Sequence, residues 1–278
     1  MSDILENKIT NIPVLNDGFI RLVDIMPRVL LQNQTCDSAI TRAARVSYGN
    51  IDTKSTPRGD RELIRYLFRN KHTSPFEMIE FTFHWKLPLF VARQVVRHRT
   101  ASLNEISARY TQLQDTFYRP SSIYFQSKDN KQGSGELITD PDIINKFYAY
   151  LDKSESLYTD YKELIDLGVS RELARIGLPV SIYTEWYWKI DLHNLLHFIK
   201  LRSDMHAQKE VRDYANAIFD IIKQFVPYTC EAFDDYEVGS IKLHKCDINA
   251  IKQNDTSHIT NKRELGEFLD KKDKIFDN

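Results

Sequence analysis

Two stretches of the chain alternate apolar and polar residues as half-buried β-strands do. They span residues 79–86 and 182–190, and the second carries aromatic residues at both sets of alternating positions. Successive side chains of a strand point to opposite faces of a sheet, so this alternation predicts two strands. A further strand is predicted near Phe19, because the turn sequence Asn16-Asp17-Gly18 joins two short apolar runs.

Apolar residues at helical spacing fill most of the remaining chain. Helices are predicted over residues 37–46, 60–69, 88–97, 141–167, 170–176, 192–203 and 207–225. Asp191 is the expected cap of the helix that follows it, and Ser74-Pro75 is a suitable helix start. Residues 54–59 and 128–135 are polar and are predicted to form loops.

The last forty residues differ in character from the rest of the chain. From Gly239 onward the sequence is polar, apart from one short helix predicted by the capping-box spacing of Asn261 and Glu264. We expect a single domain over residues 1–238 and a peripheral, partly disordered tail over residues 239–278.

Composition narrows the class of protein. The chain has 278 residues, of which 42% are apolar and 12% aromatic, enough for one large core. Lys plus Arg number 38 against 39 Asp plus Glu, a balance that argues against a protein devoted to nucleic acid. Cys36, Cys230 and Cys246 form no C-x-x-C pair. The first residues have no basic stretch followed by an apolar one, so we expect no leader, and no apolar run approaches the length of a membrane span. We expect a cytoplasmic protein with no nucleic-acid or membrane partner.

The stretch from Gln94 to Tyr110 concentrates the candidate chemistry. Arg97, His98 and Arg99 are followed closely by polar residues that include a further arginine. Guanidinium has five donors and no accessible neutral form, so a dense arginine cluster calls for an anionic partner. A solvated charged face is the plain alternative, but the interleaved Ser, Asn and Glu supply both donors and acceptors. That mixture favours a nucleotide.

Other site chemistries lack essential residues. His193 and His197 have the spacing of a zinc pair, but Asn194 replaces the glutamate of a metalloprotease and no third ligand is evident. Gly133-x-Gly135 lacks the third glycine of a dinucleotide loop. We therefore expect no metal.

Arg202 continues the apolar stripe of its predicted helix toward the core. A buried guanidinium needs a partner, and a structural pair with Asp204 is the alternative to a role in the site. Ser107 has no evident partner base and is better suited to binding than to nucleophilic attack.

The pattern Arg97-His98-Arg99, seven residues, then Ser107 resembles the signature of flavin-dependent thymidylate synthases. Residues 72–77, 171–179 and 201–208 also resemble that family, over a region from Asp37 to Phe233. The resemblance implies an α/β (α+β) fold with a largely antiparallel central sheet flanked by helices. It also implies reductive methylation of dUMP to dTMP without a cysteine nucleophile. 5,10-methylenetetrahydrofolate would give the carbon and NADPH the hydride through FAD, in a homotetramer with sites between subunits.

The resemblance also carries residue roles. Substrate dUMP would be bound by Gln94, Val95, Val96, Arg97, Glu105, Ile106, Ser107, Ala108, Arg109, Arg175 and Arg202. The cofactor FAD would be bound by Ser74, Arg97, His98, Arg99, Glu105, Asp191, Leu192, His193 and His197. Arg202 would act in catalysis by stabilising negative charge on the pyrimidine.

The chain departs from the family pattern at residues 191–197. Where many members carry asparagine and arginine against the flavin, this chain has Asp191, His193 and His197. Two other functions stay open at this point: a nucleotide-binding or RNA-binding module that grips phosphate, and a flavin reductase that transfers no methyl group.

Overall fold

The computed structural model describes residues 8–28, 35–49, 56–128 and 132–276. The chain forms two compact units, Met1–Phe233 and Asp234–Asn278.

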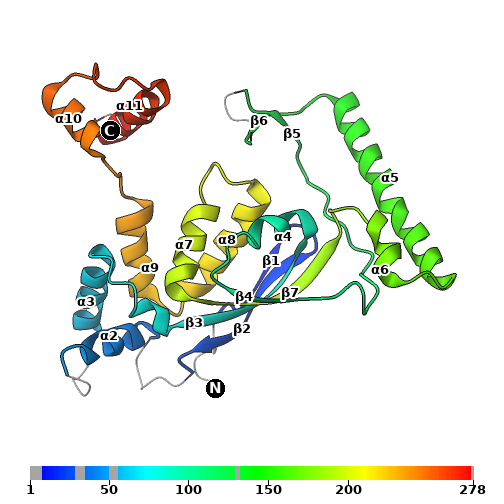
Figure 1. Cartoon of the computed structure of the whole chain (residues 1–278), viewed down its shortest axis with the longest axis horizontal. Helices are drawn as coiled ribbons and strands as arrows, with labels where there is room; N and C mark the ends of the chain where they lie inside the picture. Colours follow the sequence, from blue (N-terminus) through cyan, green and yellow to red (C-terminus); the bar gives the residue numbers. More distant parts are fainter. Residues whose placement is uncertain (1–7, 29–34, 50–55, 129–131, 277–278) are drawn as a thin grey trace. The chain divides into compact units, whose positions relative to one another are not determined.

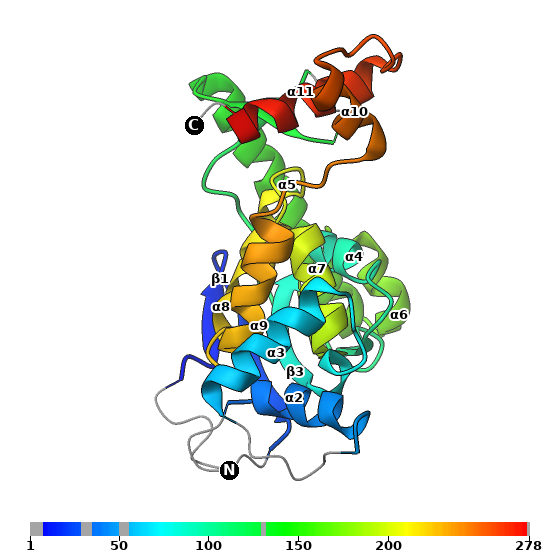
Figure 2. The same ribbon diagram turned by 90° about the vertical axis from the view of Figure 1, so that its left-hand side faces the viewer.

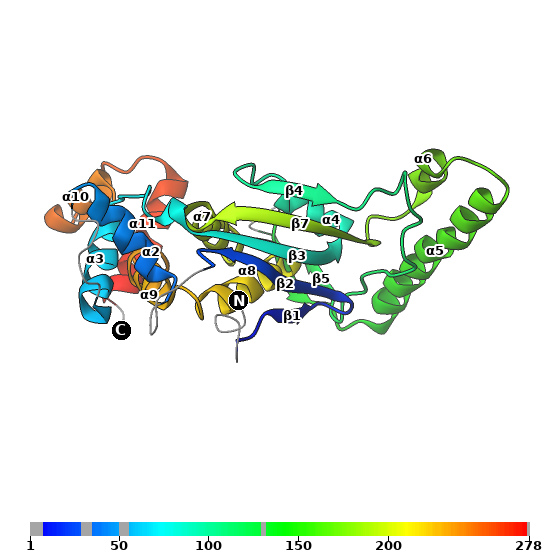
Figure 3. The same cartoon turned by 90° about the horizontal axis from the view of Figure 1, so that it is seen from below.

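The first unit is built on a five-stranded antiparallel sheet (Figure 3). In order across the sheet its strands are β1 (Asn11–Val14), β2 (Gly18–Met26), β3 (Glu80–Pro88), β7 (Tyr183–Asp191) and β4 (Ser102–Glu105). The strands predicted near residues 19, 79–86 and 182–190 are confirmed as β2, β3 and β7. Strand β4 was not predicted; it is exposed throughout and forms the sheet edge by pairing with β7.

One face of this sheet carries the core. Phe81, Phe83 and Trp85 of β3 are fully buried, and they face the helices that follow β7. These are α7 (Leu192–Arg202) and α8 (Lys209–Ile222), which lie on the same side of the sheet as α4 (Leu89–Val95) in Figure 1. The Trp85 ring stacks on Tyr214 of α8, with ring centroids 5.7 Å apart. The expected antiparallel sheet flanked by helices is confirmed.

Helices α2 (Asp37–Val46), α3 (Pro57–Arg69) and α9 (Pro227–Phe233) form a second packed group. Figures 1 and 2 show α3 and α9 side by side. The buried Asp37 carboxylate accepts hydrogen bonds from the backbone N–H groups of Tyr228 (2.9 Å) and Thr229 (3.1 Å), and so caps α9. Pro227 begins this helix. The sequence had predicted Pro227 only as the residue that ends the preceding helix.

Several predicted boundaries were wrong. The predicted start at Ser74-Pro75 leads only to a short 3₁₀ turn, η1 (Phe76–Met78), and α4 ends at Val95 rather than at Arg97. The expected loop at 54–59 is already helical from Pro57, and its residues 54–55 lie outside the described residues. In the loop expected at 128–135, residues 129–131 lie outside the described residues, and β6 (Ser134–Leu137) already pairs with β5 (Tyr124–Gln126).

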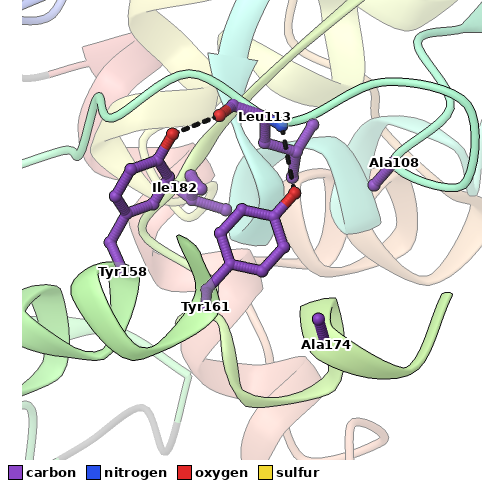
Figure 4. Close-up of a cluster of buried hydrophobic side chains, with 6 residues drawn as sticks. All are labelled: Ala108, Leu113, Tyr158, Tyr161, Ala174 and Ile182. Carbon is purple, nitrogen blue, oxygen red and sulfur yellow. Dashed lines mark hydrogen bonds between the residues drawn. The ribbon is translucent and has the colours of Figure 1, made fainter. Parts of the chain in front are cut away.

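A long helix packs against the segment that follows β4. It is α5 (Pro141–Asp166), which Asp140 caps and which precedes the short α6 (Arg171–Ala174) and the turn η2 (Arg175–Gly177). Figure 4 shows two hydrogen bonds between α5 and this segment. The Tyr158 hydroxyl donates to the Leu113 carbonyl (2.5 Å), and the Leu113 N–H donates to the Tyr161 hydroxyl (3.3 Å). Ala108 and Ala174 belong to the same buried cluster.

The second unit contains a π-helical turn, η3 (Asp234–Val238), and two helices, α10 (Lys245–Gln253) and α11 (Lys262–Phe276). The predicted cap of α11 is confirmed, because Asn261 accepts hydrogen bonds from the N–H groups of Arg263 and Glu264. Helix α10 was not predicted. Among the described residues, no helix has the length and apolar character needed to cross a membrane.

Candidate functional site

The Arg97-His98-Arg99 triplet lies in the turn that follows α4. The His98 N–H donates to the Val95 carbonyl at 2.9 Å, which keeps the triplet against the helix end. The side chains of Arg97 and Arg99 are exposed, and neither forms an ion pair with any described residue. Two guanidinium groups without a carboxylate partner, beside each other on one turn, form a suitable site for an anion.

His98 is packed inward between these two arginines. Its ring centroid lies 5.4 Å from that of Phe198 and 5.8 Å from that of His197. Burial lowers the pKa of His98, and the nearby His197 lowers it further, against the opposing effect of a hydrogen bond to the backbone of Asn194. His98 is therefore neutral near pH 7, and its ring has one donor and one acceptor nitrogen.

Arg202 meets Gln94, the residue that opens the cationic stretch. Arg202 Nη2 donates to the backbone carbonyl of Gln94 at 3.3 Å, and the Gln94 side-chain amide donates to the side-chain oxygen of Gln208. Arg202 Nε and the Ser203 hydroxyl are buried and have no partner among the described residues. A buried donor without an acceptor costs about 1–3 kcal/mol, so this arrangement calls for a ligand that accepts hydrogen bonds.

The structural alternative for Arg202, a pair with Asp204, is wrong. The Asp204 carboxylate instead accepts from the backbone N–H (2.8 Å) and the ring nitrogen (2.7 Å) of His206.

Strand β4 and the turn after it present a second set of predicted residues. The Glu105 carboxylate accepts from the buried Thr184 hydroxyl at 2.7 Å, and the Ile106 N–H donates to the Glu185 carbonyl at 2.9 Å. The Ser107 hydroxyl accepts the Arg109 N–H at 3.3 Å. These bonds hold residues 105–109 firmly on the edge of the sheet next to β7.

Arg109 and Arg175 belong to a separate group beside α6. Arg109 forms an ion pair with Glu172 at 3.1 Å, in which both side chains are more than half exposed. Arg175 is also exposed, in the turn η2 that follows α6. Ala108 and Ala174, both labelled in Figure 4, belong to one buried cluster, which brings these two segments together. Among the described residues, no hydrogen bond or ion pair joins this group to Arg202.

The apolar members of the predicted set differ in exposure. Val95, Ala108 and Leu192 are buried, whereas Val96 and Ile106 are exposed. Within this set, only Val96 and Ile106 can contact a ligand through their side chains. Val95, Ala108 and Leu192 could offer only backbone groups.

The remaining predicted cofactor residues surround the start of α7. Ser74 is exposed just before η1, which packs against α7, and the Leu192 N–H donates to the Ile79 carbonyl at 2.8 Å. The predicted cap is confirmed: Asp191 accepts from the N–H (3.0 Å) and the side-chain amide (2.7 Å) of Asn194. Both carboxylate oxygens are thus engaged within the helix start. His193 is half-buried and His197 is exposed.

The His193 and His197 pair gains no third ligand. The described residues contain no cluster of three or more His, Cys, Asp or Glu side chains able to hold a metal ion. The donor set around Arg97, Arg99 and Arg202 is cationic and fits an anionic nucleotide or cofactor.

A cavity of about 690 Å³ lies beside the segment that joins α7 to α8. Its walls come from residues 118–127 and 132–135 and from residues 205–212, and Gln208 is part of its wall. Sequence reasoning assigned no role to Gln208 or to Thr184, the partner of Glu105. The only signal for Gln208 was its place in the patch at 201–208.

Comparison with known proteins identifies close relatives. The family model described as thymidylate synthase complementing protein matches residues 28–228. A flavin-dependent thymidylate synthase from Dictyostelium discoideum is 55% identical over 269 residues, covering 96% of this chain and 88% of that protein. One from Treponema denticola is 51% identical, covering 86% of this chain and 87% of that protein.

A solved structure is also similar. The UMP/dUMP methylase PolB from Streptomyces cacaoi, in its crystal structure with 5-Br dUMP, matches with a TM-score of 0.70 and 32% identity. The match covers 81% of this chain and 98% of that chain.

Proposed function

The chain belongs to the family of flavin-dependent thymidylate synthases, and from this premise we propose that it methylates dUMP reductively to dTMP. 5,10-methylenetetrahydrofolate supplies the carbon, and NADPH supplies the hydride through FAD. The relatives described above support this function, and none of them is named as an RNA-binding module or as a flavin reductase.

Arg202 is the residue we propose for catalysis. The observation that carries the proposal is its buried Nε, which has no partner among the described residues while Nη2 is held by the Gln94 carbonyl. A guanidinium fixed in this way can donate to the pyrimidine edge and stabilise negative charge at N3 and O4. That stabilisation makes C5 nucleophilic. Arginine stays protonated at neutral pH, so its role is electrostatic.

Cysteine chemistry is not needed in this proposal. Cys36 is buried, and burial raises the pKa of its thiol to about 12. A thiolate is therefore rare at neutral pH, and Cys36 is a poor nucleophile. Cys230 is buried in α9, and Cys246 lies in the second unit.

We propose that dUMP is bound by both groups of arginines. One part of the nucleotide would contact Arg202, Gln94 and Arg97, together with Val95 and Val96. Another part would contact residues 105–109 (Glu105, Ile106, Ser107, Ala108 and Arg109) and Arg175. Arg109 and Arg175 suit the phosphate, because exposed guanidinium groups bind phosphate through paired hydrogen bonds.

We propose that FAD is held by the Arg97-His98-Arg99 turn, Glu105, Ser74 and the start of α7 from Asp191 to His197. Bound FAD would supply the reducing equivalents, taken from NADPH, that the reductive methylation needs. Arg97 and Arg99 would neutralise its phosphates, and His98 would offer a neutral ring to its polar edge. Asp191 would contribute backbone groups, since its carboxylate caps α7, and Leu192, His193 and His197 would line the same surface.

We propose a homotetramer in which the two arginine groups meet across subunits. Leu167, Leu173 and Ile176, close to Arg175 in sequence, are between 59% and 76% exposed. Large exposed apolar side chains near a charged site favour a surface that another protein chain covers. The three free cysteines fit a reducing compartment, and we propose the cytoplasm.

Purified protein tests the function directly. The proposal predicts a yellow preparation that oxidises NADPH in a dUMP-dependent manner when the folate is present. A colourless protein with salt-dependent RNA affinity would contradict it. NADPH oxidation without dTMP formation would instead identify a flavin reductase.

A further inference from the structure

The connection between α7 and α8 holds Gln94 at two points. Arg202, at the end of α7, donates to the Gln94 backbone carbonyl, and Gln208, just before α8, accepts from the Gln94 side-chain amide. Gln94 and Gln208 are 114 positions apart in the chain. One residue of the cationic stretch is thus fixed in both its backbone and its side chain by a single connecting segment.

The backbone around Gln208 is well held, while its side chain is exposed. It is the N-cap residue of α8, and its carbonyl accepts the Arg212 N–H at 3.0 Å. Arg212 Nη1 also donates to the carbonyls of Met205 (2.9 Å) and Ala207 (2.8 Å). The turn that carries Gln208 is therefore braced by a guanidinium from the first turn of the helix it precedes.

Gln94 has much less support of its own. Its half-buried side chain extends from the last turn of the short helix α4 and has three rotatable bonds. Ordering such a side chain costs up to about 2 kcal/mol of rotamer entropy. The hydrogen bond to Gln208, whose backbone is already held in the free protein, removes part of this cost before a ligand binds. Gln208 forms part of the wall of the cavity of about 690 Å³, so the hydrogen-bond partner of Gln94 borders open space.

We propose that Gln208 is a positioning residue for dUMP, which holds the Gln94 amide in its binding orientation. This inference rests on the proposed function, in which Gln94 contacts dUMP. Gln208 acts through Gln94, while Arg202 fixes the Gln94 backbone from the other side. Loss of Gln208 leaves Arg202 in place and frees only the Gln94 side chain.

Two substitutions of similar size separate this role from a simple packing role. Gln208→Met removes the acceptor, and Gln208→Glu keeps an oxygen that can accept the same Gln94 N–H. We expect Gln208→Met to weaken dUMP binding by about 3- to 10-fold, the usual effect of one lost hydrogen bond. KM for dUMP rises in parallel, kcat at saturating dUMP changes by less than about 2-fold, and FAD affinity is unchanged. Gln208→Glu restores binding to within about 2-fold of the unsubstituted protein.

A double-mutant cycle with Gln94→Ala tests whether Gln208 acts through Gln94. In the Gln94→Ala background, Gln208→Met should cause no further loss of dUMP affinity, because its only effect has been removed. Gln224→Met is the matched control. It removes the hydrogen bond that the Gln224 side-chain amide donates to the Ile9 carbonyl (3.1 Å), outside the proposed site. The control should bind dUMP normally.

Additive losses of dUMP affinity in the cycle, or normal dUMP binding by Gln208→Met, would overturn the role of Gln208 but leave the proposed function intact. Unsubstituted protein that bound no dUMP would overturn the proposed function as well.

Discussion

Arg202 and Gln94 are joined by a hydrogen bond between the Arg202 guanidinium and the Gln94 backbone carbonyl, 3.3 Å long. That carbonyl lies in the last turn of α4, where helix carbonyls carry partial negative charge, and it also accepts the N–H of Arg97 at 3.4 Å. The helix end thus binds the guanidinium and orients it. The buried Nε of Arg202 stays without a partner in the described part of the chain.

Replacing Arg202 by alanine should abolish dTMP formation. Removal of a donor that stabilises developing charge lowers kcat by about 100-fold or more. FAD should remain bound, because its proposed phosphate contacts come from Arg97 and Arg99. Product chromatography measures dTMP, and the flavin absorbance of the purified variant measures bound FAD.

Arg58→Ala serves as the control, since Arg58 forms an exposed pair with Glu62 on α3. Near-normal turnover by the Arg202 variant would show that the catalytic assignment is wrong.

Subunits that carry different defects should complement each other. We expect Arg202→Ala and Arg175→Ala to be inactive separately and to regain activity when co-expressed, because some mixed sites receive both arginines. Random mixing of two chains leaves about a quarter of such shared sites intact. Steady-state dTMP formation by the mixed oligomers provides the measurement. If mixtures stay as inactive as either variant, both arginines serve a site from the same chain.

Asp191 should affect stability more than cofactor binding. Its carboxylate caps α7, so Asp191→Ala should lower the free energy of unfolding by about 1 kcal/mol. Asp191→Asn keeps a good cap and removes the charge, so its stability should stay close to that of the unsubstituted protein. FAD affinity should be the same in the asparagine variant and the unsubstituted protein, as flavin fluorescence can report. A large change in that affinity would place the side chain against the flavin.

The buried Asp37 predicts a specific dependence of stability on pH. Burial raises the pKa of its carboxyl from 3.8 to about 6, against the opposing effect of hydrogen bonds from Thr229 and Tyr228. Between these values the folded protein binds more protons than the unfolded chain. This carboxyl therefore makes the free energy of unfolding fall as pH rises from about 4 to about 6, by ~3 kcal/mol at most.

Asp37→Asn lacks this titration. The difference in unfolding free energy, unsubstituted protein minus variant, should decrease with pH across the same window in urea denaturation. Parallel curves would rule out a raised pKa at this position.

The elements of the fold could be predicted where burial of one face gives the sequence a regular alternation of apolar and polar residues. Strands β3 and β7 lie in the middle of the sheet with a buried face, so their alternation is clear. Strand β4 has only exposed residues, and its conformation comes from pairing with β7 rather than from a local pattern. Helix α10 was missed for a similar reason, because only Asp247 and Ala250 of its residues are buried.

The sequence indicates which residue types form the proposed site, but not the contacts among them. The density of arginines from Arg97 to Arg109 indicates an anion site from chemistry alone. The bond from Arg202 to the Gln94 carbonyl depends on how α7 returns over the sheet, which no local sequence signal encodes. The same holds for Gln208, whose partner is set by tertiary packing.

One measurement addresses the central claim of dUMP methylation most directly. Protein with bound FAD is reduced anaerobically and mixed with dUMP and 5,10-methylenetetrahydrofolate labelled in its methylene carbon. The account predicts dTMP with the label in its methyl group, together with reoxidation of the flavin. Flavin that stays reduced, or that is reoxidised without labelled dTMP, would contradict it.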